Sequence, residues 1–213
     1  MRKSIILGIS MAIAAIHAPA LAQEKADDIA QLKQRVDQLE NQVREMSKIL
    51  EPLKAQQVRD QRQRELRKKF ELRNKQDQDK YSGEQLAEAE KLYQVANSKW
   101  GTPEATESLE KMIKQYPEVN RTGCAVLYLA QTSKGPEQTA KLNECIEKYN
   151  DCMYGDGVQV GALARFLLVQ LYKSGNDEEK AEAMENEIRT KFPDAVDHGG
   201  NLLVDDLKES SGH

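Results

Sequence analysis

The sequence predicts an all-α protein, with an N-terminal parallel coiled coil followed by a helical-repeat domain of about three antiparallel helix pairs. After residue 28, aliphatic residues recur at alternating spacings of three and four, the pattern of a coiled-coil seam. Further along, three similar segments each end in an aromatic residue followed by proline or asparagine, as second helices of pairs would. Only 12 glycines and 6 prolines occur in 213 residues, which suits a mostly helical chain.

Residues 1–22 have the features of a cleavable signal peptide. Two basic residues precede an apolar run over 5–16, which is too short to span a bilayer, and Ala20-Leu21-Ala22 supplies a small-x-small cleavage site. We expect the mature chain to start near Gln23, to be exported to a bacterial periplasm, and to have no transmembrane segment.

Residues 23–53 form the predicted oligomerisation segment. β-Branched or aliphatic residues at one core position favour parallel association of two or three chains. Arg35 of one chain would face Glu40 of a neighbour, and the stretch between them resembles a short motif of parallel trimeric coiled coils. We therefore expect a homotrimer, with a dimer as the alternative and an amphipathic helix packed on its own domain as the other interpretation. The seam consists of Ile29, Leu32, Val36, Leu39, Val43, Met46, Leu50 and Leu53.

Residues 54–80 are predicted to be a charged helical linker. Pro52 cannot donate a backbone hydrogen bond, so the coil is expected to end or kink there. From Arg59 to Lys80 the chain carries 9 basic and 5 acidic residues, which indicates a stiff solvated connector or a basic patch that touches an anionic polymer. Residues 81–213 carry 14 basic and 23 acidic residues, and this acidic balance argues against nucleic-acid binding.

Residues 81–207 are predicted to contain the helix pairs. Ser82 is the expected N-cap of the first helix, with Gln85 three residues later as in a capping box. The three similar segments stop at Pro117, Asn150 and Pro193, at spacings of 33 and 43 residues, and the longer spacing indicates an insertion. A short capping helix is expected over 201–207, followed by a disordered tail over 208–213.

The three cysteines predict one disulfide in an oxidising compartment, with one thiol left over. Cys124 with Cys145, on two facing helices, is the first choice. Cys145 with Cys152 is the alternative, and it requires the chain to turn between them. Their spacing matches no zinc-ligand pattern, and the leftover thiol is expected to be buried and inert.

The helix pairs resemble degenerate tetratricopeptide repeats. The match rests on Leu92, Ala105, Leu109 and Pro117 in the first pair, and on Leu168, Tyr172, Ala181 and Pro193 in the third. Such repeats stack into a concave groove formed mostly by the first helix of each pair. The resemblance implies a partner-binding groove lined by Glu90, Gln94, Asn97, Leu127, Gln170 and Lys173. For Leu127, packing between helices is the stronger interpretation.

The order of signal peptide, short trimer-type coil, polar linker and three repeats resembles the CpoB (YbgF) family of periplasmic proteins associated with the Tol–Pal system. The family implies a role in coordinating outer-membrane constriction with peptidoglycan synthesis at division, through contacts with envelope proteins. Compared with that family, this chain has weaker repeats, a more charged linker and three cysteines, so the resemblance is one of architecture.

The sequence offers little catalytic chemistry. His198 and His213 are the only histidines after the signal peptide, and no Cys/His pairing with an orienting partner is evident. We therefore predict no enzyme, no cofactor and no metal site. The sequence-based hypothesis is a non-enzymatic exported adaptor that oligomerises and binds envelope proteins. The alternative is a structural spacer that contacts the cell wall, with peptidoglycan as its partner, through the coil and basic linker.

Overall fold

A computed structural model describes residues 7–209 of the chain, with side chains from 28 to 207. The described residues form helices and two isolated β-bridges, so the chain is all-helical there. The predicted signal peptide (1–22) and the predicted tail (208–213) lie outside the part with described side chains. Between residues 7 and 209, no helix is long and apolar enough to cross a membrane. The helices are Leu7–Lys80 (α1), Gly83–Ser98 (α2), Pro103–Gln115 (α3), Asn120–Thr132 (α4), Pro136–Lys148 (α5), Val160–Ser174 (α6), Glu178–Lys191 (α7) and Leu203–Glu209 (α8).

The chain divides into two compact units, Met1–Arg59 and Asp60–His213. The first unit is the N-terminal part of α1, which continues through Pro52 where the sequence predicted an end or a kink. Every described side chain around that proline is exposed. Pro52 therefore removes one backbone hydrogen bond from a turn that is exposed to solvent, and water can hydrogen-bond to the carbonyl that loses its partner.

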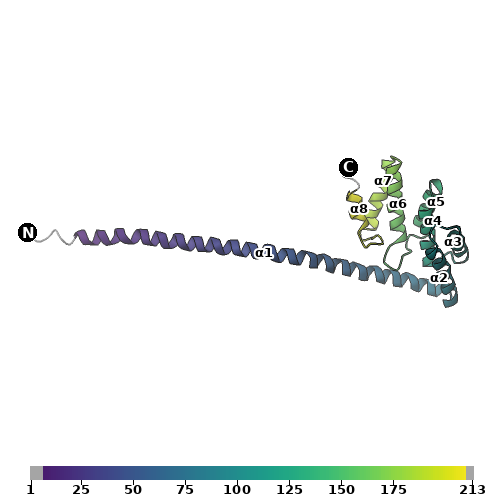
Figure 1. Ribbon diagram of the computed structural model, residues 1–213, viewed down its shortest axis with the longest axis horizontal. Helices are drawn as coiled ribbons and strands as arrows, with labels where there is room; N and C mark the ends of the chain where they lie inside the picture. The colour runs from purple at the N-terminus through teal and green to yellow at the C-terminus, as the bar shows by residue number, and fades with distance from the viewer. Residues whose placement is uncertain (1–6, 210–213) are drawn as a thin grey trace, which may run out of the picture. The chain divides into compact units, whose positions relative to one another are not determined.

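The second unit contains three helix pairs, α2 with α3, α4 with α5 and α6 with α7, which follow one another from teal to yellow in Figure 1. The predicted capping box is confirmed, because Ser82 accepts from the backbone of Gln85 and the Gln85 side chain accepts from Ser82. Gly101 and Gly135 turn the chain between paired helices with positive φ angles of 74° and 61°, which side chains rarely adopt.

The core of this unit lies between the helices, and α4 is its centre. Residues 122–130 of α4 are all buried, since neighbours cover the helix on every side. A short helix does follow the third pair: α8 buries Leu203 and Leu207 against the core. The loops before α6 and α8 are alike, since each is closed by an antiparallel bridge, Met153 with Gln159 and Val196 with Leu202.

Residues 60–80 of α1 belong to the second unit and pack on its loops, although the sequence predicted a solvated linker over 54–80. Leu66 is 3% exposed and packs with Met153 and Val196, while Phe70 and Leu202 border the same cluster. Contacts to loops that lie far along the chain cannot be inferred from a segment made almost entirely of charged residues and glutamine. The last turns of α1 are therefore part of the second unit.

Candidate functional site

The predicted seam is an apolar stripe of α1 whose side chains are all exposed. Its side chains are between 49% and 64% exposed, although they are aliphatic or methionine. Apolar residues at this spacing and exposure are unusual on a helix unless a partner covers them. The exposures are Ile29 55%, Leu32 64%, Val36 52%, Leu39 53%, Val43 57%, Met46 54%, Leu50 49% and Leu53 51%.

Charged residues flank the seam on both sides. Arg35 and Glu40 are exposed, and neither forms an ion pair with another described residue. Both remain free for a neighbouring chain, as the predicted pairing requires. The first unit therefore has the two features that parallel coiled coils use, an apolar stripe and flanking charges of opposite sign.

The residues predicted for the repeat groove have different environments. On α2, Glu90 accepts from Gln94 at 2.6 Å and from Arg121 of α4 at 2.7 Å, while Asn97 is exposed. Leu127 is fully buried, so its side chain packs between helices and does not reach a groove. On α6, Gln170 is exposed and Lys173 forms an ion pair with Glu185 of α7 at 2.7 Å.

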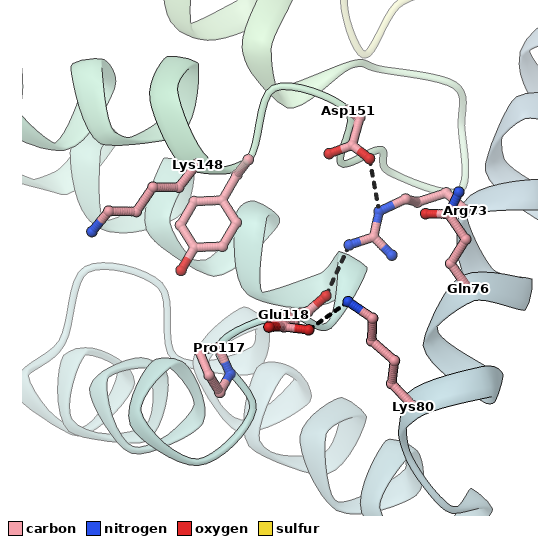
Figure 2. Close-up of a pocket in the computed structure, with 8 residues that line it drawn as sticks. Arg73, Gln76, Lys80, Pro117, Glu118, Lys148 and Asp151 are labelled. Carbon is pink, nitrogen blue, oxygen red and sulfur yellow. Dashed lines mark hydrogen bonds and ion pairs between the residues drawn. The ribbon is translucent and has the colours of Figure 1, made fainter.

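A cavity of about 440 Å³ opens where the end of α1 meets the loops of the first two helix pairs. Figure 2 shows residues of α1 on one side, the loop before α4 below, and the end of α5 with the residues after it opposite. Its lining residues are Arg73, Gln76, Lys80, Pro117, Glu118, Lys148, Tyr149 and Asp151. None of them was among the predicted site residues.

Arg73 organises this region. Its side chain is 12% exposed, it pairs with Asp77, and its Nη2 donates to the Glu118 carbonyl at 2.9 Å. Asp151 lies 3.4 Å from its Nε (Figure 2), an ion pair without hydrogen-bond geometry. Asp77 in turn accepts a hydrogen bond from the backbone N–H of Asn120 at 2.8 Å, and it thereby caps the N-terminus of α4. The residue at the N-cap position itself, Val119, makes no side-chain capping hydrogen bond.

The rim of the cavity carries a second ion pair. Lys80 Nζ donates to Glu118 at 2.5 Å, and this hydrogen bond raises the pKa of Lys80 and lowers the pKa of Glu118. Opposite, desolvation raises the pKa of the Tyr149 phenol to about 12, so its hydroxyl stays protonated at neutral pH. The Lys80–Glu118 pair therefore stays charged near pH 7.

A signal for this arrangement was present in the sequence. Leu66, Phe70, Arg73 and Asp77 follow each other at spacings of four, three and four, so they share one face of α1. On this face an apolar pair is followed by a basic and an acidic residue. Such a stripe indicates a face that packs on its own domain.

The predicted disulfide between Cys124 and Cys145 is not formed. All three cysteines are buried free thiols, and no two lie at disulfide distance. The Cys124 thiol donates to the Met153 carbonyl at 3.6 Å, in the loop that follows α5. Desolvation raises the pKa of Cys124 and Cys145, and it raises the pKa of Cys152 to about 11.

Few groups in the described part of the chain suggest catalysis. No three His, Cys, Asp or Glu side chains among residues 28–207 gather closely enough to hold a metal ion. His198 pairs with Asp156 at 2.8 Å and contacts the Tyr154 ring, which joins the two similar loops.

Comparisons with protein-family models, with curated proteins and with solved structures found no match.

Proposed function

We propose that the chain is an exported, non-enzymatic adaptor of the cell envelope that associates through residues 23–53 and binds protein partners with its repeat unit. The exposed seam is the observation that carries this proposal. Eight apolar side chains in register leave about half of their surface to water in the single chain. Burying apolar surface contributes roughly 25 cal/mol per Å², so covering this stripe favours association of several copies.

A parallel homotrimer fits the seam best. Aliphatic residues at both core positions are compatible with two or three chains. The motif that runs from Arg35 to Glu40 resembles those of trimeric coils, and both charges are free in the single chain. A dimer is the other outcome that the same seam allows.

The repeat unit supplies the binding surface in this proposal. By resemblance to tetratricopeptide repeats, Glu90, Gln94 and Asn97 on α2 and Gln170 and Lys173 on α6 line the surface toward a partner. These side chains are polar, which suits a non-obligate protein partner. Oligomerisation would present several such surfaces at once, so weak individual contacts gain avidity.

Charged substitutions in the seam test the assembly. We expect Val36→Asp with Val43→Asp to yield a folded monomer, because several carboxylates would meet in an apolar interface. The matched control is Val58→Asp, since Val58 is 57% exposed, like Val43, but lies off the seam spacing. Light scattering reads the mass of each. An unchanged mass of the double variant contradicts the proposal.

A second candidate function, a spacer that contacts the cell wall, is favoured by exposed cations on α1. Arg67, Lys68 and Lys69 are all exposed, in the part of α1 that packs on the second unit. Cosedimentation with purified peptidoglycan, with and without charge reversal at these three positions, separates the two functions. Binding that disappears on charge reversal favours the spacer.

A further inference from the structure

The apolar stripe of the first unit is widest in its last heptad. Ile49 directly precedes Leu50 of the seam, and it lies one helical turn from Met46 on one side and from Leu53 on the other. Its side chain is 65% exposed, a larger fraction than that of any residue of the seam. The stripe therefore has two rows of large apolar residues up to Val43, and a third position beyond it.

The residues beside the seam identify what covers it. Those directly before one core row are Asp28, Arg35, Gln42 and Ile49, and those directly after the other core row are Lys33, Glu40, Ser47 and Lys54. In a parallel pairing of identical chains in register, each residue of the first row faces the residue five positions later in the neighbour. Asp28 then meets Lys33 of the next chain. Arg35 likewise meets Glu40, so opposite charges meet twice and a second copy of this chain fits the stripe.

The same register brings Ile49 to Lys54 of the neighbouring chain. Lys54 is exposed and forms no ion pair with another described residue, whereas the nearby Glu45 and Lys48 pair with each other at 2.7 Å. A lysine can lay its aliphatic stem along apolar surface while its ammonium stays in water. Lys54 can therefore cover Ile49 without burying a charge.

The width of the stripe bears on the number of chains. A strict two-row seam is sufficient for a helix that faces one neighbour, while a stripe that adds a flanking position is typical of helices that pack in a bundle. When three helices meet, each has a neighbour on either side, so contact extends from the core rows onto the flanking rows. Ile49 lies in a flanking row, and it is covered more fully by three chains than by two.

We propose that Ile49 is a core residue of the assembly, that it packs on the aliphatic stem of Lys54 of the neighbouring chain, and that this contact selects three chains over two. This inference rests on the proposed association through residues 23–53. It deepens that proposal, because it assigns the choice between trimer and dimer to a residue outside the seam.

The first test measures the mass of the mature chain, Gln23 to His213, by sedimentation equilibrium. We expect three chains for the unaltered protein and two for Ile49→Glu, because a glutamate forms an ion pair with Lys54 and leaves no apolar side chain for a third helix. The control is Val58→Glu, at a side chain that is 57% exposed and lies off the seam spacing, and it should stay at three chains. Three chains for Ile49→Glu overturn the proposal.

The second test asks whether the two side chains touch. Ile49→Ala should raise the concentration at which half of the assembly has dissociated roughly tenfold, because it removes apolar surface from the interface. Lys54→Ala should also raise it, while Lys54→Met, which keeps a long apolar stem, should leave it unchanged. Combining Ile49→Ala with Lys54→Ala should add little to Ile49→Ala alone. Additive effects, or a Lys54→Met variant as weak as Lys54→Ala, overturn the proposal.

The two proposals fail in different ways. If the mature chain is a dimer, or if the Ile49 variants assemble like the unaltered protein, this inference fails and the adaptor function stands. A monomeric mature chain contradicts the proposed function itself.

Discussion

Replacing Leu66 with alanine tests whether the end of α1 is part of the second compact unit. Leu66 is 3% exposed and packs with Met153 and Val196, and its side chain reaches within 3.1 Å of the place where a Cβ on Gly157 would lie. Truncating a buried leucine costs roughly 2–5 kcal/mol. The cluster is small and its border is only partly buried, so we expect a loss of about 2 to 3 kcal/mol.

The same helix offers a matched control. Leu72→Ala makes an identical change at a side chain that is 65% exposed, so we expect a change within about 0.5 kcal/mol. Both variants would be unfolded in urea and followed by the fluorescence of Trp100, the one tryptophan of the chain. Its ring centroid lies 3.8 Å from that of the buried Tyr128, so the signal reports on the second unit.

The comparison of the two variants is decisive. A Leu66→Ala midpoint that matches Leu72→Ala would mean that residues 60–80 are a solvated linker, as the sequence alone suggested. A clear difference, with the slope of the urea dependence unchanged, would place Leu66 in the core of the unit.

Three further outcomes are expected. Gly123→Ala should lower the free energy of unfolding by about 1–3 kcal/mol, because a Cβ there would lie 2.5 Å from the Cβ of Cys152. Gly83→Ala, where no atom lies within 4 Å of the new Cβ, should be near neutral in the same urea titration. At pH 8 a thiol reagent should label Cys152 slowly in the folded chain and rapidly in urea, because burial raises its pKa to about 11, and fast native labelling would show that the thiol is accessible. The hydrogen bond that Arg165 donates to Glu187 lowers the pKa of Glu187, so the stability that this pair contributes is present above about pH 4.5 and is lost as the pH falls through the lowered pKa. Glu187→Gln should therefore reduce the loss of thermal stability in acid. An identical pH profile for the variant would show that the pair contributes nothing.

Features decided by neighbours in the chain were predictable. The capping box at Ser82 and the end of α3 before Pro117 depend on residues within one turn of the helix boundary. The all-helical class follows from the same local patterns.

Features decided by distant contacts were not predictable. Asp77 caps α4 from 43 positions away, and the cavity joins Arg73 to Asp151 across two helix pairs. The disulfide expectation came from compartment and spacing, but the orientation of Cys124 toward the Met153 carbonyl depends on the loop after α5. A long-range arrangement of this kind requires the folded structure.

The solution mass of the mature chain, Gln23 to His213, tests the central claim most directly. Light scattering should be run beside a chain that starts at Asp60, because this start keeps Leu66, Arg73 and Asp77 with the unit that they pack against. We predict a trimer for the mature chain and a folded monomer for the shorter one. A monomer in both cases would contradict the account, since the exposed seam would then have no partner.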